Sequence, residues 1–257
     1  MIAPFRKTAK GWEGSAPWRR HAVEVCIPVI DPMDTLPEVL ALLRLQTVSP
    51  YIVLIDTGSQ PAQLEALEAL RGPDVEIHRI ASAGQRHASA SVAVALDLAV
   101  SLCRSECLLM THQDCFLRRR AAVSALLERL NPHNPVAGYQ ISPRQIPDWQ
   151  MMVGHTWTGL HLPTIRQTSA RWGFDGQKDF DTEYGFCRAL QRCGIVPEML
   201  GTEENYRRNI NLDFDHVRSW PSAGLYSATH RAKASAWMAE ALSEARQRVK
   251  AWSLEPA

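Results

Sequence analysis

The chain has 257 residues, of which 46% are hydrophobic and 21% are charged, and this composition is ordinary for a globular protein with one large domain. Its 28 basic and 27 acidic side chains give a formal net charge of +1, so no overall field favours nucleic acid or an anionic membrane as a partner. No apolar run approaches the roughly 18 residues that a transmembrane segment needs.

The first 21 residues differ from the rest of the chain. They are rich in basic side chains and contain no apolar run of the kind found in a secretory signal. We therefore expect residues 1–21 to form a loose N-terminal arm. The six cysteines make no paired C-x-x-C motif, and several lie in apolar runs. This usage is typical of reduced thiols in the core of a cytoplasmic protein rather than of a disulfide framework.

Apolar and β-branched runs alternate with helical patterns in the first half of the chain. Alternation of strands with helices of this length is typical of βαβ units. We therefore predict an α/β fold with a Rossmann-like, mainly parallel sheet and helices on both faces. The strands are predicted at 23–30, 51–56, 75–81 and 106–110, and the helices between them at 36–46, 60–71 and 88–103.

The second half of the chain has a less regular pattern. Residues 143–172 are rich in proline, tryptophan, histidine and glycine, and we expect them to be irregular. A long amphipathic pattern predicts a C-terminal helical extension within residues 228–257. A boundary is placed near residue 132. The other elements predicted here are helices at 119–130 and 181–193 and strands at 136–142 and 195–200.

Polar side chains stand where three of the predicted strands end. Asp31 follows the first strand, Asp56 ends the second, and the segment THQD, with His112 and Asp114, ends the fourth. Ligands of open α/β sheets bind outside the carboxyl ends of the strands. We therefore expect these side chains to border one crevice, and their convergence indicates a binding site rather than a set of solvated turns.

Five short motifs follow these elements in order. In this order they resemble the motifs of inverting glycosyltransferases with the GT-A fold, a family-2-like group typified by polysaccharide and rhamnosyl transferases. The resemblance covers most of residues 23–200. The motifs are VEVCIPVID (23–31) followed by LRLQT (43–47), LIDTGS (54–59), THQD (111–114), GFDG (173–176), and KDFDTE (178–183) followed by Arg188 and Gly194.

The resemblance implies a function and a division of labour along the chain. An enzyme of this kind moves a sugar from a nucleotide-sugar donor to an acceptor hydroxyl with inversion, and a divalent cation, Mn²⁺ or Mg²⁺, stabilises the leaving diphosphate. Residues 22–132 would form the nucleotide-sugar-binding half, and residues 133–227 the acceptor-binding and catalytic half. The acceptor would be a saccharide or a lipid-linked molecule, and nucleic acid is not an expected partner.

The resemblance assigns donor-side roles to residues at the strand ends. Asp114 matches the second Asp of the family's D-x-D motif, which commonly ligates the metal. His112 replaces the first Asp, which serves the metal or the ribose, and an imidazole there would favour Mn²⁺ over Mg²⁺. Asp56 matches the residue that contacts the base or ribose, and Asp31 and Ser59 join it in the predicted donor site.

The acceptor hydroxyl must lose a proton as it attacks, which calls for a nearby carboxylate as general base. By the family's acidic motif that base is Asp181, and Asp179 is its competitor. The late segment FDHVRSW (214–220) resembles one whose histidine often reaches the metal or the diphosphate. His216 is therefore a candidate metal ligand, and Arg218 is a candidate donor contact.

Each donor-side assignment has a structural alternative. His112 and Asp114 would also suit a link from strand to turn, in which Asp114 caps the next segment. Asp56 would also suit an Asx turn in which Gly58 has a positive φ, and this turn is compatible with a carboxylate presented to a ligand. His216 has the alternative of an ordinary surface histidine.

Other groups allow two interpretations as well. The acidic residues of 178–183 would compensate the dipole of a following helix. The arginine run 118–120 suits either the solvated start of a helix or a peripheral contact with an anionic lipid surface. Three tryptophans suit either the core or a stacking surface for an acceptor sugar, namely Trp149, Trp157 and Trp172.

An alternative function is a non-catalytic nucleotide- or carbohydrate-binding protein on a transferase-like fold. Three departures from the family favour it: Thr57 and His112 each replace an Asp, and SVAVALD (91–97) lacks an Arg-Asn pair. A sugar nucleotidylyltransferase or a dehydrogenase would need a glycine-rich loop after the first strand, where this chain has PVIDPMDT (28–35). The glycosyltransferase interpretation therefore stands first.

Overall fold

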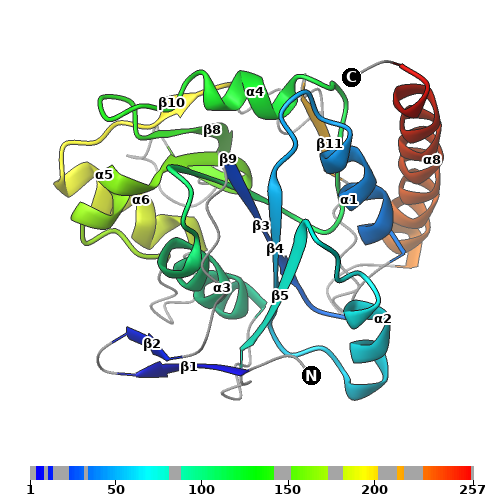
Figure 1. Ribbon diagram of the computed structural model, residues 1–257, viewed down its shortest axis with the longest axis horizontal. Helices are drawn as coiled ribbons and strands as arrows, with labels where there is room; N and C mark the ends of the chain where they lie inside the picture. Colours follow the sequence, from blue (N-terminus) through cyan, green and yellow to red (C-terminus); the bar gives the residue numbers. More distant parts are fainter. Residues whose placement is uncertain are drawn as a thin grey trace.

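The computed structural model describes residues 4–8, 11–13, 23–31, 34–80, 88–141, 152–172, 182–201, 213–216 and 228–255. In this part of the chain, nine strands form one mixed sheet in the order β10-β8-β9-β6-β3-β4-β5-β1-β2 (Figure 1). These strands are β1 (Pro4–Thr8), β2 (Gly11–Glu13), β3 (Val23–Val29), β4 (Tyr51–Asp56), β5 (Val75–Ile80), β6 (Cys107–Thr111), β8 (Val136–Ile141), β9 (Met152–His161) and β10 (Glu198–Met199).

The central strands β3, β4, β5 and β6 run parallel. β3 pairs with β4 on one side, where Val29 lies opposite Asp56, and with β6 on the other, where Cys26 lies opposite Met110. β9 runs antiparallel between β6 and β8. The carboxyl ends of the central strands therefore meet at one edge of the sheet, and the predicted α/β fold with a mainly parallel sheet is confirmed.

Side-chain alternation along the strands divides the core into two layers. Val25 and Ile27 of β3 contribute to one layer, and Cys26 between them contributes to the other. Helices exclude water from both layers, as predicted. The first layer is covered by α1 (Leu36–Arg44), α2 (Leu64–Glu68) after a 3₁₀ turn (Pro61–Gln63), α4 (Ala122–Leu127) and α8 (Ala228–Ser253), and the second by α3 (Ala88–Leu102), α5 (Leu162–Gln167) and α6 (Thr182–Arg192).

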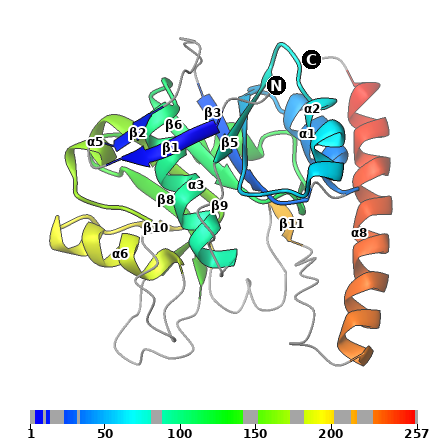
Figure 2. The same cartoon turned by 90° about the horizontal axis from the view of Figure 1, so that it is seen from below.

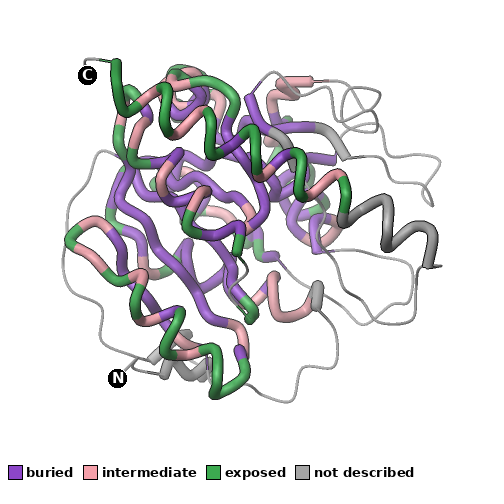
Figure 3. Tube along the Cα trace, turned by 90° about the vertical axis from the view of Figure 1, so that its right-hand side faces the viewer, coloured by how far each residue is buried: buried purple, intermediate pink, exposed green. Residues whose placement is uncertain are grey.

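Helix α8 is the C-terminal helical extension that the sequence predicts. It packs along α1 and β7 on the outer side of the molecule (Figure 2). Ala241 and Ala245 are buried against the core, whereas much of the outward surface of the described helix is exposed (Figure 3). Two alanines four residues apart lie on the same face of a helix, and their small side chains let α8 approach the core closely.

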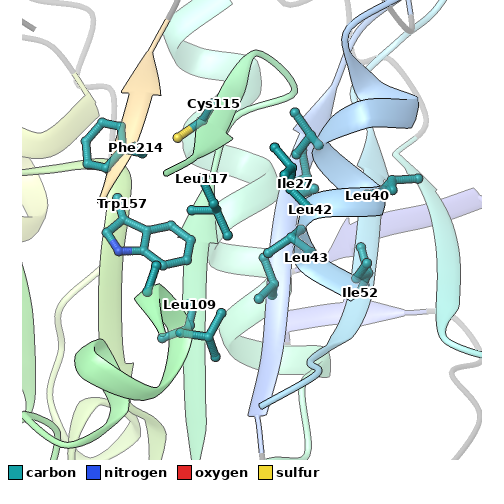
Figure 4. Close-up of a cluster of buried hydrophobic side chains, with 14 of the residues drawn as sticks. Ile27, Leu40, Leu42, Leu43, Ile52, Leu109, Cys115, Leu117, Trp157 and Phe214 are labelled. Atoms are coloured by element: carbon teal, nitrogen blue, oxygen red, sulfur yellow. The ribbon is translucent and has the colours of Figure 1, made fainter. Parts of the chain in front are cut away.

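A second, two-stranded sheet lies over the first core layer. It pairs β7 (Cys115–Leu117) with β11 (Phe214–His216) in antiparallel register. Figure 4 shows Phe214 and Leu117 of this sheet near Trp157 of β9 within one buried cluster. The Phe214 ring also meets Tyr139 of β8 edge-on, with 4.9 Å between ring centroids. This packing holds the segment after β6 against the main sheet.

Two expectations about the elements are wrong. Residues 143–172 are not irregular throughout, because the described residues 152–172 contain the ten-residue strand β9 and the helix α5. β9 is buried along its whole length, so it lacks the alternation that identifies a half-exposed strand. The described residues 4–8 of the arm are also not loose, because they form β1, which extends the sheet at β5 through the pairs Pro4–Arg79 and Phe5–Ile80; an edge strand offers unpaired backbone groups for such an addition.

Candidate functional site

The loop after β3 and the turn after β4 are joined at the carboxyl edge of the sheet. Asp31 adopts a left-handed backbone conformation with φ 46°, which aspartate tolerates better than most residues. Its amide donates to Ser59 Oγ at 2.7 Å, and its Oδ1 accepts from the amide of Gln60 at 2.7 Å. Two of the predicted donor-site residues, Asp31 and Ser59, are therefore in direct contact.

Asp56 is fully buried, and both of its oxygens face protein groups. Oδ1 accepts hydrogen bonds from the amides of Gly58 at 3.2 Å and Ser59 at 2.8 Å. Gly58 has φ 124°, so the predicted Asx turn is present. Oδ2 lies 3.2 Å from Nε of Arg79 on the neighbouring strand β5. A contact of Asp56 with a base or ribose stays a prediction, and Arg79 is a cation at this edge that sequence reasoning missed.

The segment after β6 closes against the loop after β3. Gln113 Nε2 donates to the carbonyl of Ile30 at 3.2 Å, and Thr35 Oγ1 donates to the carbonyl of Gln113 at 2.8 Å. Asp114 is buried and His112 is half-buried. The three strand ends therefore meet at one edge, as the strand order predicts.

Strand β11 lies beside the residues that follow THQD. Its register places His216 opposite Cys115, and facing Cα atoms in an antiparallel ladder are about 4.5–5.5 Å apart. The backbone of His216 is therefore adjacent to the residue that follows Asp114 in the chain. The side chain of His216 lies outside the described part, so its role as a metal ligand stays a prediction.

A buried aspartate anchors β11 in this position. Asp213 Oδ2 accepts a hydrogen bond from Tyr139 Oη at 2.7 Å, and Oδ1 is in ion-pair contact with Arg119 Nη2. The backbone carbonyl of Asp213 also accepts from the amide of Arg118 at 2.8 Å. Burial and the hydrogen bond to Asp213 raise the pKa of Tyr139. Sequence reasoning missed Asp213, although its place just before the FDH segment was an available signal.

A group of polar and aromatic side chains stands behind His112. The ring of His155, on β9, lies 4.4 Å from that of His112 between centroids, with the planes tilted by 40°. Nδ1 of His155 is in contact with Oε1 of Glu183 in the first turn of α6. Trp172 meets His155 edge-on at 6.0 Å and stacks on Phe186 at 4.1 Å. Sequence reasoning missed His155 because β9 was not recognised as a strand.

Several buried polar atoms in this region have no hydrogen-bond partner among the described residues. They are Thr111 Oγ1, Gln113 Oε1, Trp172 Nε1 and Glu183 Oε2. Buried polar atoms are rarely left unpaired, and each such atom in a native structure needs an explanation such as a bound water or ligand. Their presence around the end of β6 and the start of α6 is consistent with a binding site there.

The predicted catalytic carboxylates lie next to this region in the chain. The described residues resume at Thr182, and both Thr182 and Glu183 are buried. The acidic motif therefore leads directly into the helix turn that contacts His155. The residues from the sequence-based predictions that lie outside the described ranges are Asp179, Asp181, Arg218 and Trp149.

Packing resolves the alternative for two of the tryptophans, and it supplies ion-pair partners for two of the arginines. Trp157 and Trp172 are at most 1% exposed, so they belong to the core and offer no open face to a sugar. Within the run 118–120, the second and third arginines form ion pairs with Asp213 and Glu255. These two guanidinium groups are thus engaged within the protein.

The described residues contain no group of three His, Cys, Asp or Glu side chains arranged to hold a metal. Asp114 and His112 offer one carboxylate and one imidazole from a single turn. Magnesium-type sites often hold the ion through one or two carboxylates plus the phosphates of a substrate, rather than through an all-protein cage. The donor set therefore fits a cation that is completed by a bound ligand, and it does not fit a closed structural site.

The helices and the cysteines of the described chain give two further observations. None of the described helices is both long and apolar enough to cross a membrane. All six cysteines are described, none is in a disulfide, and five of them are buried. Burial raises the pKa of Cys107 to about 11 and that of Cys187 to about 12. The prediction of buried, reduced thiols is therefore confirmed for five of the six.

Comparison with known proteins finds a similar fold but no matching sequence family. No model of a protein family matches the chain, and no curated protein matches it either. Among solved structures, it is similar to the mannosyltransferase PcManGT from Pyrobaculum calidifontis in complex with GDP-Man and Mn²⁺, with a TM-score of 0.54, 14% identity, and coverage of 93% of this chain and 77% of that chain.

It is also similar to TarS residues 1–349 from S. aureus in complex with UDP-GlcNAc. The TM-score is 0.52 and the identity 12%, and the match covers 86% of this chain and 66% of that chain. Both neighbours are glycosyltransferases of the GT-A type. At these identities the likeness shows the fold, so the chain has a GT-A-type fold, and the likeness does not extend to a particular family of sugar transferases.

Proposed function

We propose that the protein is a glycosyltransferase that moves a sugar from a nucleotide-sugar donor to an acceptor hydroxyl with inversion. The observation that carries this proposal is the meeting of three strand ends at the carboxyl edge of a GT-A-type sheet. Asp31 and Ser59 are bonded to each other there, and the THQD segment is bonded to the loop after β3. In open α/β sheets this edge is where ligands bind.

On the donor side, Asp114 and His112 would hold a divalent cation, Mn²⁺ or Mg²⁺, against the diphosphate. The cation would neutralise the negative charge that accumulates on the leaving group. His216 is the third candidate ligand, because its strand runs beside the residues that follow Asp114. Arg218 would contact the diphosphate, and Asp31, Asp56 and Ser59 would bind the nucleoside. The similar mannosyltransferase forms a complex with GDP-Man and Mn²⁺, which supports this arrangement by analogy.

On the acceptor side, Asp181 would act as general base, with Asp179 as its competitor. The acceptor oxygen attacks the anomeric carbon from the side opposite the diphosphate, and its proton passes to the carboxylate. The bond between the anomeric carbon and the diphosphate oxygen breaks in the same displacement, which inverts the centre. The carboxylate contributes only during transfer, so it lowers the barrier without adding to donor affinity.

The acceptor and the location are parts of the same proposal. A saccharide or a lipid-linked molecule would supply the hydroxyl, and residues 133–227 would form the acceptor side. A peripheral membrane contact is compatible with a lipid-linked acceptor. A cytoplasmic location is proposed because buried, reduced thiols persist where the surroundings are reducing.

A thermal-shift panel of UDP, GDP, dTDP and CMP, each with Mn²⁺, tests the proposal. A ligand at 100 times its dissociation constant adds about 2.7 kcal/mol of stability, which raises the Tm of a chain of this size by roughly 5–10 °C. Asp114→Asn should abolish the Mn²⁺-dependent part of the shift while the chain stays folded, as its own Tm without ligand shows. If no nucleotide stabilises the wild type, the donor site is not where we place it.

A second candidate function is non-catalytic binding of a nucleotide or carbohydrate. One observation favours it: Asp56 is fully buried, with one oxygen bonded to its own turn and the other paired with Arg79. This use of Asp56 within the protein suits a binding role, although Oδ2 makes no hydrogen bond to the described residues and could still accept one from a ligand. Release of free nucleotide from a nucleotide sugar by the wild type, and its loss in Asp181→Asn, would favour the enzyme. Nucleotide binding without any such release would favour the binding protein.

A further inference from the structure

His155 occupies a position that the proposed function does not yet use. It comes from β9, the antiparallel neighbour of β6, and its ring lies 4.4 Å from the ring of His112 between centroids. His155 is 9% exposed, so it is more shielded from solvent than the half-buried His112. A side chain in this position can set the orientation of the His112 ring.

Two side chains, Glu183 and Trp172, contact His155 directly, and a third supports Trp172. Glu183, in the first turn of α6, contacts its Nδ1 through Oε1. Trp172 meets its ring edge-on at 6.0 Å, and Phe186 of α6 stacks on Trp172 with the planes only 7° apart. Helix α6 and the imidazole are therefore packed as one unit. A shift of either one relative to the other would break an aromatic contact as well as the Glu183 contact.

Stability alone gives a weak reason for this arrangement. The Glu183 side chain is 5% exposed and that of His155 is 11% exposed, and taking a carboxylate and an imidazole out of water is costly. Apolar residues of similar volume are often equally stable at such sites. A carboxylate that orients a metal-ligating imidazole is a common arrangement around metal sites, and here the ring contact of His155 with His112 would extend that arrangement by one side chain.

We propose that His155, held by Glu183, is a positioning residue that fixes the ring of His112 for donor and cation binding. It thereby ties the amino end of α6, which follows the acidic motif with Asp181, to the donor side of the crevice. This inference rests on the proposed function. Groups that orient a ligating side chain typically contribute about 10- to 100-fold to affinity or activity.

The test is isothermal titration of the full chain with UDP, GDP, dTDP and CMP, each with Mn²⁺. For the nucleotide that binds the wild type, His155→Ala should weaken binding by about 10-fold or more. Glu183→Gln keeps the shape of the pair and should weaken binding less. His161→Ala is the matched control, because His161 is also a buried histidine of β9 beside a glutamate, Glu106, but faces the start of β6. The control should bind as the wild type does.

A double mutant separates positioning from a merely structural role. If His155 acts through His112, then His112→Ala with His155→Ala should bind no more weakly than His112→Ala alone. Additive losses, or a wild-type dissociation constant in a folded His155→Ala, would overturn the inference and leave the proposed function standing. Should His155→Ala fail to fold, Glu183→Gln takes its place in both comparisons, alone and combined with His112→Ala. Additive losses or a wild-type dissociation constant would again overturn the inference. A wild type that binds none of the four nucleotides would overturn both.

Discussion

Removing the carboxylate of Asp213 tests how β11 is held beside β7. This side chain accepts a hydrogen bond from Tyr139 at 2.7 Å and contacts Arg119. Asp213→Ala removes both contacts and leaves the Tyr139 hydroxyl buried without its acceptor. β11 places His216 opposite Cys115. A variant that loosens β11 should therefore also weaken nucleotide binding in the presence of Mn²⁺.

The expected cost follows from the two contacts. A hydrogen bond to a charged acceptor contributes about 1.5–3 kcal/mol. The contact with Arg119 contributes less, about 0.2–1 kcal/mol, because the arginine side chain is 48% exposed and screened by water. Together they give about 3 kcal/mol. For a chain of this size that corresponds to a fall in Tm of roughly 6–12 °C.

Scanning calorimetry of three single variants and one double variant at neutral pH measures the two parts separately. Asp213→Asn can still accept from Tyr139 but loses the charge that faces Arg119, so its Tm should fall by at most about 4 °C. Tyr139→Phe removes the same hydrogen bond from the other side. The double variant Tyr139→Phe/Asp213→Ala should therefore lose less stability than the sum of the losses in the two single variants.

Two results would refute this reasoning. A fall in Tm of less than about 2 °C for Asp213→Ala would mean that its contacts contribute almost nothing. Fully additive losses in the double variant would mean that Tyr139 and Asp213 do not depend on each other. Either result would mean that the contacts of Asp213 with Tyr139 and Arg119 do not hold β11 beside the candidate site.

Asp181→Asn should lower turnover by roughly two to four orders of magnitude while donor affinity barely changes; if Asp179→Asn alone abolishes transfer, our register across the acidic motif is off by two. Cys193 is the exposed cysteine, so a thiol reagent should label the native protein once, and labelling that persists in Cys193→Ser would contradict the burial of the others. Burial and the bond to Asp213 raise the pKa of Tyr139, so the folded phenol keeps its proton above about pH 10, where the unfolded phenol ionises. Stability is therefore lost as the pH rises, and Tyr139→Phe should lose less Tm between pH 9 and pH 11 than the wild type; an equal loss would place the alkaline effect elsewhere.

The sequence determined the parts of this protein that depend on local pattern. Alternating strands and helices predicted the mainly parallel sheet covered on both faces, and a long amphipathic stretch predicted α8. The order of the strand ends placed Asp31, Asp56 and the THQD segment at one edge, where hydrogen bonds join the three strand ends. These predictions succeed because βαβ connections fix strand direction, and direction fixes which residues share an edge.

Only the tertiary structure decided the features that depend on contacts between residues distant in the chain. β9 is buried on both faces and enters the sheet antiparallel, so no period in its sequence shows that His155 will meet His112. The contact of Glu183 with His155 depends on how α6 packs, and the anchoring of β11 depends on Asp213 finding Tyr139 across the first core layer. Such contacts join residues that are distant in the chain, and only the packing of complete elements brings them within reach.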